Sequence, residues 1–221
     1  MSYYWDEFIK DIQSNVLPGQ VVLDAGAGDC HWRKHFSSEV KYIGMDLGVG
    51  DSTADYSKLD IEGDLRKIPL EDNSVDTVIS IQVFEHLPEP WKVLSELNRI
   101  LRSGGDIYIT CPQAEPQHQV PHDFLRYTPF GLRSLLESNG FEVIWIKPQL
   151  GNFSHIGDTL IYSAKKLPML TNNYPIKIFL LFLSTYLRLI QKIHRPLLLH
   201  FDQFEEFQDN VTGHFVKARK L

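Results

Sequence analysis

The sequence predicts an α/β protein: a Rossmann-like, seven-stranded, mostly parallel sheet with helices on both faces and a helical insertion before the last strand. Three observations lead to this prediction. Short apolar runs alternate with helical patterns as far as residue 148. Residues 149–210 look helical and contain no obvious series of strands. Residues 211–221 then alternate roughly as a strand does, which indicates a final strand returning to the sheet.

The expected elements follow one another in an order that favours a parallel sheet. The expected strands are 21–23, 41–46, 58–62, 75–80, 106–111, 141–147 and 213–220. The expected helices are 32–37, 91–101 and 128–139. Strands separated by helices need crossover connections, which give a parallel sheet covered on both faces. We therefore expect a core over 1–148, an insertion over 149–210 and a last core strand over 211–221.

Local signals justify the individual elements. Val21–Leu23 is wholly apolar, which indicates a buried strand, and the strand over 41–46 ends in an acid. The helix over 91–101 has apolar residues at helical spacing, and the glycine pair at 104–105 is expected to stop it. Thr128 is a suitable N-cap for the next helix, with a proline at its first position.

Composition limits the function classes. The 221 residues carry a formal net charge of −6 and no long basic run, so nucleic acid is not expected as a partner. Cys30 and Cys111 stand in unrelated patterns, which argues against a disulfide framework and fits a reducing compartment. The first residues lack the basic and apolar regions of a secretory signal, and no apolar run approaches the ~20 residues that cross a bilayer. We expect a cytoplasmic protein.

A glycine-containing turn follows the first strand. Gly26 and Gly28 have no Cβ, so the backbone there can turn tightly and approach a ligand. A dinucleotide-binding turn needs a third glycine where His31 stands, and no lysine–serine or lysine–threonine pair follows as in a Walker loop. Asp24 would repel a pyrophosphate but suits a ligand with a cationic end, such as an ammonium group.

Three further features follow later strands, and one precedes the fifth. Asp46 ends the second strand and Asp64 follows the third; a carboxylate at position 46 could accept hydrogen bonds from both hydroxyls of a ribose. Phe84-Glu-His86-Leu-Pro follows the fourth strand, and Leu101-Arg-Ser-Gly-Gly105 precedes the fifth. A single acid at a strand end is commonly a helix cap or a turn former. Packing alone does not readily produce the whole ordered series.

With these motifs, the sequence from Val21 to Lys147, together with the final strand, resembles the class I S-adenosylmethionine-dependent methyltransferases. Phe84-Glu-His86-Leu resembles the signature of the group, often called type 11, that acts on small molecules and on lipid or sugar intermediates. The resemblance implies S-adenosylmethionine as cofactor. The cofactor-binding residues it implies are Asp24, Ala25, Gly26, Gly28, Asp46, Leu47, Asp64, Leu65 and Gln82. Arg102 and Ser103 replace the lysine and proline usual in the family, which should not affect the chemistry.

The candidate substrate residues lie in 112–127, after the fifth strand. This stretch resembles a signature of methyltransferases from bacterial polysaccharide gene clusters. Histidine titrates near neutral pH, so His122 is our first candidate for a general base, followed by His86 and then by His118. The alternative for each is a solvated or backbone-bonded loop histidine. The candidate substrate-binding residues are His118, Asp123, Arg126 and Tyr127.

For residues 112–127 we also consider a structural role for Arg126 and a metal site at two of the histidines. Arg126 could bind an anionic substrate group, or it could form a structural pair with Asp123. His118 and His122 have the spacing of a helical metal-ligand pair, but Pro121 stands between them, so we expect no metal.

The apolar segment 178–190, with basic residues at its flanks, leaves three interpretations open. It is a lid over the substrate pocket, a homodimer contact, or part of a stretch (176–200) that docks on a membrane surface.

We expect an enzyme that methylates an oxygen of a small-molecule or glycan/lipid-linked acceptor by in-line displacement, as in polysaccharide biosynthesis. The alternatives are an NAD-dependent Rossmann oxidoreductase and a non-catalytic regulatory domain that binds S-adenosylmethionine.

Overall fold

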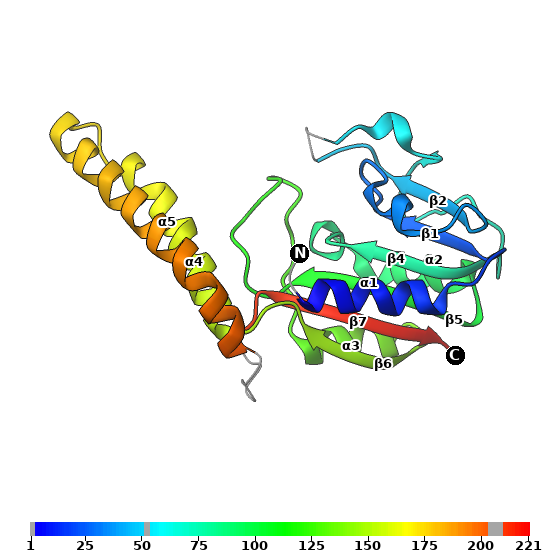
Figure 1. The fold of residues 1–221 in the computed structure, drawn as a ribbon. Helices are drawn as coiled ribbons and strands as arrows, with labels where there is room; N and C mark the ends of the chain where they lie inside the picture. Colours follow the sequence, from blue (N-terminus) through cyan, green and yellow to red (C-terminus); the bar gives the residue numbers. More distant parts are fainter. Residues whose placement is uncertain (1–2, 51–53, 203–209) are drawn as a thin grey trace. The chain divides into compact units, whose positions relative to one another are not determined.

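A computed structural model describes residues 3–50, 54–202 and 210–221. The chain forms two compact units, one of residues 1–149 with 213–221 and the other of residues 150–212. The first unit contains a seven-stranded sheet (Figure 1). Its strands are β1 (Val21–Ala25), β2 (Lys41–Asp46), β3 (Ile61–Glu62), β4 (Val75–Ile81), β5 (Leu101–Pro112), β6 (Phe141–Pro148) and β7 (Gly213–Lys220).

The order of strands across the sheet is β3-β2-β1-β4-β5-β7-β6. All pairings among β1 to β5 are parallel, and β7 runs antiparallel between β5 and β6. The winding reverses between β1 and β4, and ligands bind at the carboxyl ends of the strands at such a point. The predicted Rossmann-like, mostly parallel sheet is confirmed, including the return of the last strand after a helical insertion.

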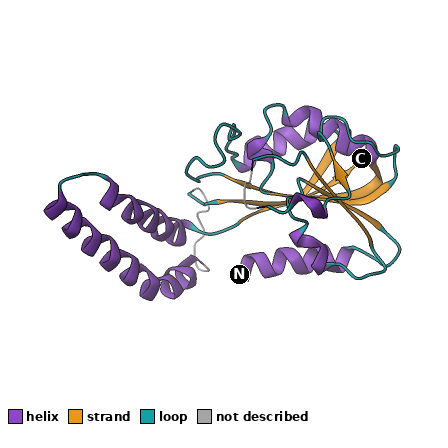
Figure 2. Cartoon of the chain, turned by 90° about the horizontal axis from the view of Figure 1, so that it is seen from above, coloured by secondary structure: helices purple, strands orange, loops and turns teal. Residues whose placement is uncertain are grey.

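Helices cover both faces of the sheet (Figure 2). Helix α1 (Tyr3–Asn15) packs Phe8 and Ile12 against one face, where Tyr108 and Phe215 complete an apolar cluster. Helices α2 (Pro90–Ile100) and α3 (Pro129–Glu137) cover the other face with the larger cluster. The expected cap is present: the Thr128 hydroxyl accepts a hydrogen bond from the Gly131 N–H at 3.1 Å.

Several elements of the structure differ from the sequence-based expectations. The helix expected over 32–37 is a short 3₁₀ helix, His31–His35. The third strand has only two residues. β5 begins at Leu101 and runs through both glycines, because Leu101 already pairs with Val75 before a bulge shifts the register. Helix α2 therefore ends at Ile100, before the glycine pair that was expected to stop it.

The second unit contains α4 (Asn152–Lys166) and α5 (Tyr174–Asp202), which lie side by side as a helical hairpin (Figure 1). Gly157 lets the two helices approach closely, because a Cβ there would stand 2.9 Å from the Leu198 side chain. The buried Asp202 carboxylate accepts a hydrogen bond from the Phe153 N–H at the start of α4, at 3.0 Å. No helix in the described part of the chain is both long and apolar enough to cross a membrane.

Candidate functional site

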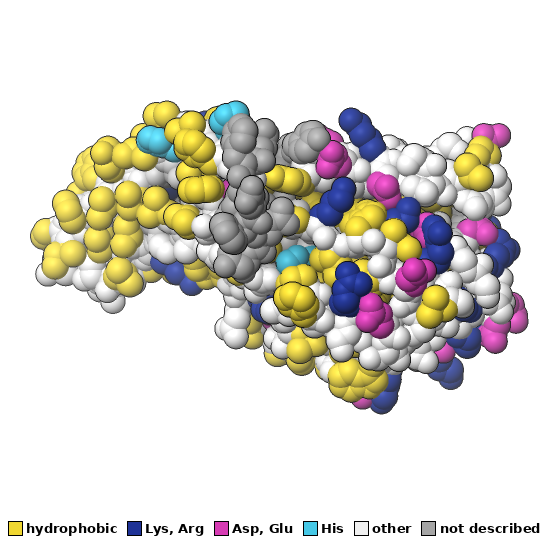
Figure 3. Space-filling view, turned by 90° about the horizontal axis from the view of Figure 1, so that it is seen from below, with side chains coloured by type: hydrophobic (Ala, Val, Ile, Leu, Met, Phe, Trp, Pro, Cys, Tyr) yellow, Lys and Arg dark blue, Asp and Glu magenta, His cyan; other side chains and the backbone are white. Residues whose placement is uncertain are grey.

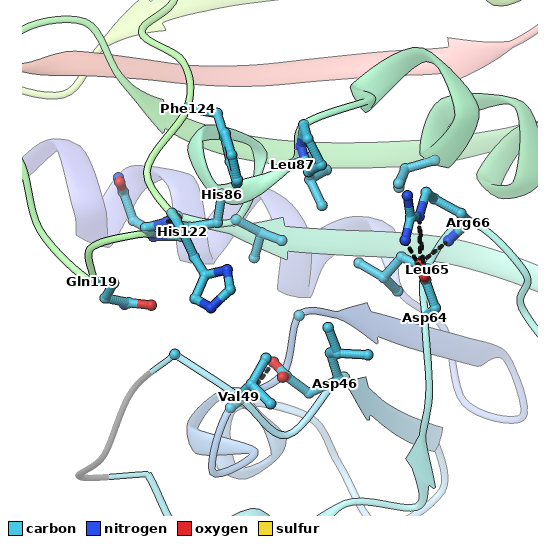
Figure 4. Close-up of a pocket in the computed structure, with 18 of the residues that line it drawn as sticks. Asp46, Val49, Asp64, Leu65, Arg66, His86, Leu87, Gln119, His122 and Phe124 are labelled. Atoms are coloured by element: carbon cyan, nitrogen blue, oxygen red, sulfur yellow. Dashed lines mark hydrogen bonds and ion pairs between the residues drawn. The ribbon is translucent and has the colours of Figure 1, made fainter.

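A cavity of about 540 Å³ lies at the carboxyl ends of β1, β2 and β4 (Figure 4). The predicted site residues that line it are Gly26, Gly28, Asp46, Leu47, Asp64, Leu65, Gln82, His86 and His122. Asp46 is the last residue of β2, and the others come from turns or loops that follow strands. Parallel strands bring these positions to one edge of the sheet. The cavity thus combines predicted cofactor residues with both leading candidates for a general base.

The turn after β1 exposes the backbone of Gly26 and Gly28 to the cavity. The N–H groups of Gly26 and Ala27 donate to the Met45 carbonyl at 2.8 and 3.0 Å, which ties the turn to β2. Gly26 has φ +88°, and a Cβ there would lie 2.3 Å from Cγ2 of Val83. Gly28 has φ +54°, and a Cβ there would meet nothing within 4 Å. The turn needs glycine at position 26 for space as well as for conformation.

Asp46 joins this turn to the next one. One of its carboxylate oxygens accepts from the Gly28 N–H at 3.0 Å and the other from the Gly48 N–H at 2.9 Å. The side chain is partly exposed and lines the cavity. A carboxylate oxygen has two lone pairs, so each oxygen of Asp46 keeps one for a ligand hydroxyl.

Asp64 is held as an ionised acceptor by Arg66. The guanidinium approaches the Asp64 carboxylate to 2.7 Å, and this hydrogen bond holds the pKa of Asp64 below its usual range. Arg66 also pairs with Glu89 at 2.9 Å. Arg66 and Glu89 both line the cavity, and the sequence analysis did not select either of them. Leu65, between Asp64 and Arg66, is buried and offers an apolar surface beside them.

Asp24 and Ala25 are fully buried and do not belong to the lining of the cavity. One oxygen of the Asp24 carboxylate accepts a hydrogen bond from the Tyr42 hydroxyl. The other has no hydrogen-bond partner among the described residues, and burial raises the pKa of Asp24 to about 7. Contact between Asp24 and a cofactor ammonium therefore stays a prediction. Tyr42, which the sequence analysis missed, is the partner that the structure gives to this acid.

The loop after β5 is fastened to the turn after β4. The Glu85 carbonyl accepts from the N–H groups of Phe124 and Leu125 at 2.8 and 3.1 Å. His86 Nδ1 forms a hydrogen bond with the carbonyl of His122. Burial lowers the pKa of His86, which favours its neutral form. These bonds place both histidines at the cavity.

The other predicted substrate residues lie outside the lining of the cavity. Arg126 donates to both carboxylate oxygens of Asp123, at 2.6 and 2.9 Å, and this pairing holds the pKa of Asp123 well below its usual range. The buried Tyr127 hydroxyl donates to the Phe84 carbonyl at 2.8 Å. His118 is also set back from the cavity. Asp123, Arg126 and Tyr127 fasten the loop internally, so the structural alternative for the Asp123–Arg126 pair is the one that the geometry favours.

The residues that line the cavity fit S-adenosylmethionine better than a dinucleotide. The Asp46 and Asp64 carboxylates line the cavity together with a bare-backbone turn, and a buried acid with an unpartnered oxygen lies near the end of β1. A pyrophosphate would face the carboxylates of Asp46 and Asp64, whereas a ribose and a cationic ligand would be attracted. His31 occupies the position of the third glycine of a dinucleotide turn.

A domain model and curated proteins that match this chain are methyltransferases. Residues 23–109 match the model of a methyltransferase domain family. A Mycolicibacterium smegmatis protein named "Probable S-adenosylmethionine-dependent methyltransferase" is 34% identical over 159 residues, which cover 63% of this chain and 60% of that protein. An arsenite methyltransferase of Halobacterium salinarum is 28% identical over 65% of this chain and 42% of its own length. The chain thus spans three fifths or less of these curated relatives.

Solved structures share the fold. The phosphoethanolamine N-methyltransferase 2 of Haemonchus contortus, solved with S-adenosyl-L-methionine, superposes with a TM-score of 0.57 over 98% of this chain and 52% of its own, at 17% identity. The ordered motifs, the match to the domain model and the sheet topology agree with one another. Residues 23–109 therefore match a methyltransferase domain family, and the chain shares its fold with a solved methyltransferase that binds S-adenosyl-L-methionine.

Proposed function

We propose that the protein transfers a methyl group from S-adenosylmethionine to a hydroxyl oxygen of a small-molecule, sugar or lipid-linked acceptor. One observation carries this proposal: a single cavity is lined by the cofactor motif and by His122, which comes from the loop after β5. Figure 4 shows the labelled side chains of Asp46, Asp64 and His122 around this cavity. A regulatory domain that only binds the cofactor would need the cofactor motif but not a histidine at position 122.

The residues of the chain have distinct tasks in this reaction. S-adenosylmethionine, when bound, supplies an electrophilic methyl group. Asp46 and Asp64 hold the adenosine part, and the glycine turn lets the ligand approach the backbone. His122 takes the proton of the acceptor hydroxyl, since an imidazole is an effective base near neutral pH. Most of the rate comes from holding the two reactants close and in line.

We expect His122→Asn to lower the methyl-transfer rate by about 10²-fold or more, the usual contribution of a positioned general base. The affinity for S-adenosylhomocysteine should stay within about threefold, because the backbone carbonyl of residue 122 still binds His86 Nδ1. Calorimetry with S-adenosylhomocysteine and with NAD measures binding, and a tritiated-methyl assay on sugar and lipid-linked alcohols measures transfer. His194→Asn, on the exposed surface of α5, is the matched control. Binding of S-adenosylhomocysteine with no transfer to any alcohol would favour the regulatory alternative.

The outer face of α5 supports a lipid-linked acceptor. Exposed apolar side chains recur at helical spacing along this helix: Phe179, Phe182, Tyr186, Leu189, Ile193 and Leu197. Hydrophobic side chains gather along the hairpin at the left of Figure 3. Between residues 150 and 202 the sequence has six lysines or arginines against two aspartates, although the whole chain carries a net charge of −6. An apolar stripe on a basic helix pair is suited to the surface of an anionic membrane.

The membrane proposal predicts that the protein sediments with vesicles containing anionic phosphatidylglycerol and much less with neutral phosphatidylcholine vesicles. The double variant Phe182→Ser/Ile193→Ser should lower the bound fraction about tenfold, because the two side chains are 73% and 74% exposed on the stripe. Phe130→Ser, on α3, removes an aromatic that is 82% exposed and serves as the matched control. A dimer that depends on the same two side chains, without vesicle binding, would show that the stripe binds a second copy instead.

A further inference from the structure

Three side-chain atoms that carry lone pairs converge beside the cavity. The Oε1 atom of Glu85 lies 3.9 Å from Nε2 of His86 and 4.0 Å from Nε2 of His118. One ligand atom from each of the three residues lies within 4.8 Å of the others. Glu85 and His86 belong to the turn after β4, and His118 comes from the loop after β5.

The hydrogen bonds of the two rings fix which nitrogen carries a proton. His86 Nδ1 contacts the His122 carbonyl, and His118 Nδ1 lies 3.1 Å from the Pro116 carbonyl. A carbonyl oxygen only accepts, so in each ring Nδ1 is the donor. In the neutral ring the lone pair is then on Nε2, the atom that faces Glu85. Nε2 of His86 and Nε2 of His118 are therefore both hydrogen-bond acceptors, and they face the Glu85 carboxylate, which is an acceptor as well.

Two of the three converging residues have buried atoms without a hydrogen-bond partner in the described part of the chain. Glu85 is fully buried, and neither of its carboxylate oxygens has a hydrogen-bond partner there. Nε2 of His86 is also buried without one. A proton on Glu85 would not solve the problem, because separations of 3.9 and 4.0 Å are too long for hydrogen bonds. Buried polar atoms normally have partners, and converging acceptors without a donor between them suit a cation.

We propose that Glu85, His86 and His118 form a binding site for a divalent transition-metal ion of the Zn²⁺ type. Two imidazoles and one carboxylate are a usual ligand set for such ions. Ligand atoms at about 2.1 Å from a tetrahedral ion lie about 3.4 Å from one another, so the cluster closes with shifts below about 1 Å. The Nδ1–H···O=C bonds are the outer contacts that orient metal-binding histidines. From the sequence, His118 and His122 were not expected to bind a metal, whereas the fold places His118 beside His86.

The site would leave coordination positions open. Three protein ligands are typical of catalytic sites, where the remaining position holds water or substrate. His86 lines the cavity, so an ion on its Nε2 would stand next to the acceptor. There it would lower the pKa of a bound hydroxyl, whose proton His122 then accepts. This last step rests on the proposed methyl transfer to oxygen, but metal binding itself does not.

The test begins with the 221-residue chain, stripped of metal by a chelator. We expect calorimetry with Zn²⁺ to give one ion per chain with a dissociation constant of about 1 μM or lower, and Co²⁺ to give a visible absorption band of a low-symmetry site. Glu85→Gln and His118→Asn should each weaken Zn²⁺ binding at least tenfold, whereas His194→Asn should leave it unchanged. S-adenosylhomocysteine affinity in His118→Asn should match that of the wild type, which shows that the variant folds. Absence of stoichiometric binding, or equal affinity in a folded His118→Asn protein, would overturn the site.

A second measurement separates this inference from the proposed function. Transfer that the chelator abolishes and Zn²⁺ or Co²⁺ restores would support both proposals. Stoichiometric metal binding without transfer to any alcohol would leave the metal site standing and remove the proposed reaction. Transfer at full rate in the stripped protein would overturn the part of the ion in the reaction, and the calorimetry with Zn²⁺ would still decide the binding site itself.

Discussion

Asp46→Ala is expected to weaken S-adenosylhomocysteine binding by about 100-fold or more. Hydrogen bonds to a charged acceptor contribute roughly 1.5–3 kcal/mol each, and each 1.4 kcal/mol is a factor of ten in affinity. The variant would lose two acceptors for the ribose hydroxyls. It would also release the Gly28 and Gly48 N–H groups, which now donate to Asp46. The turn that presents the cofactor would lose one of its supports.

Two further variants make the Asp46 experiment specific. Asp46→Asn keeps one carbonyl acceptor and should bind S-adenosylhomocysteine with an affinity between those of the wild type and Asp46→Ala. Glu142→Ala removes an exposed acid on β6, away from the cavity, and should bind like the wild type. Calorimetry gives the dissociation constants, and thermal unfolding without ligand confirms that each variant folds. Unchanged affinity in a folded Asp46→Ala protein would remove this residue from the cofactor site.

The sheet could be predicted because each core strand carries its own local signal. The expected limits of β2 and β7 match the observed ones, and β4 differs by one residue. The early start of β5 at Leu101 was not predicted, because it depends on a bulge next to the pairing of Leu101 with Val75. No local sequence pattern indicates such a bulge. Helix α1 did leave a signal, since Phe8, Ile12 and Val16 recur at helical spacing and are buried. No helix was predicted in that segment.

Some residues of the candidate site could likewise be predicted from local sequence signals, and others could not. Gly26, Asp46 and Asp64 each follow a predicted strand, so the topology alone brings them together. Arg66 contacts Asp64 from only two positions away, but nothing in that spacing shows whether an arginine points at the acid or at solvent. The contact of His118 with His86 depends on the path of the loop after β5. That path is set by backbone hydrogen bonds to Glu85, which a one-dimensional pattern does not encode.

Gly26→Ala is expected to cost about 2–4 kcal/mol of unfolding free energy, more than the ~1–2 kcal/mol of a left-handed non-glycine residue alone. The added Cβ would stand 2.3 and 2.7 Å from the two γ-carbons of Val83, which itself lines the cavity. Either Val83 or the turn must move, and both movements change the surface on which the cofactor would lie. We therefore also expect S-adenosylhomocysteine binding to fall at least tenfold. Chemical unfolding and calorimetry measure the two effects.

Gly19→Ala separates backbone strain from the steric clash. Gly19 has φ +82°, close to the +88° of Gly26, but a Cβ at position 19 would meet nothing within 4 Å. It should therefore show the conformational cost alone and leave cofactor affinity unchanged. Adding Val83→Ala to Gly26→Ala removes both γ-carbons and should recover part of the lost stability, whereas Val83→Ala alone should not stabilise the protein. If Gly26→Ala and Gly19→Ala cost the same and neither changes affinity, the close contact between Gly26 and Val83 has no part in forming the cofactor site.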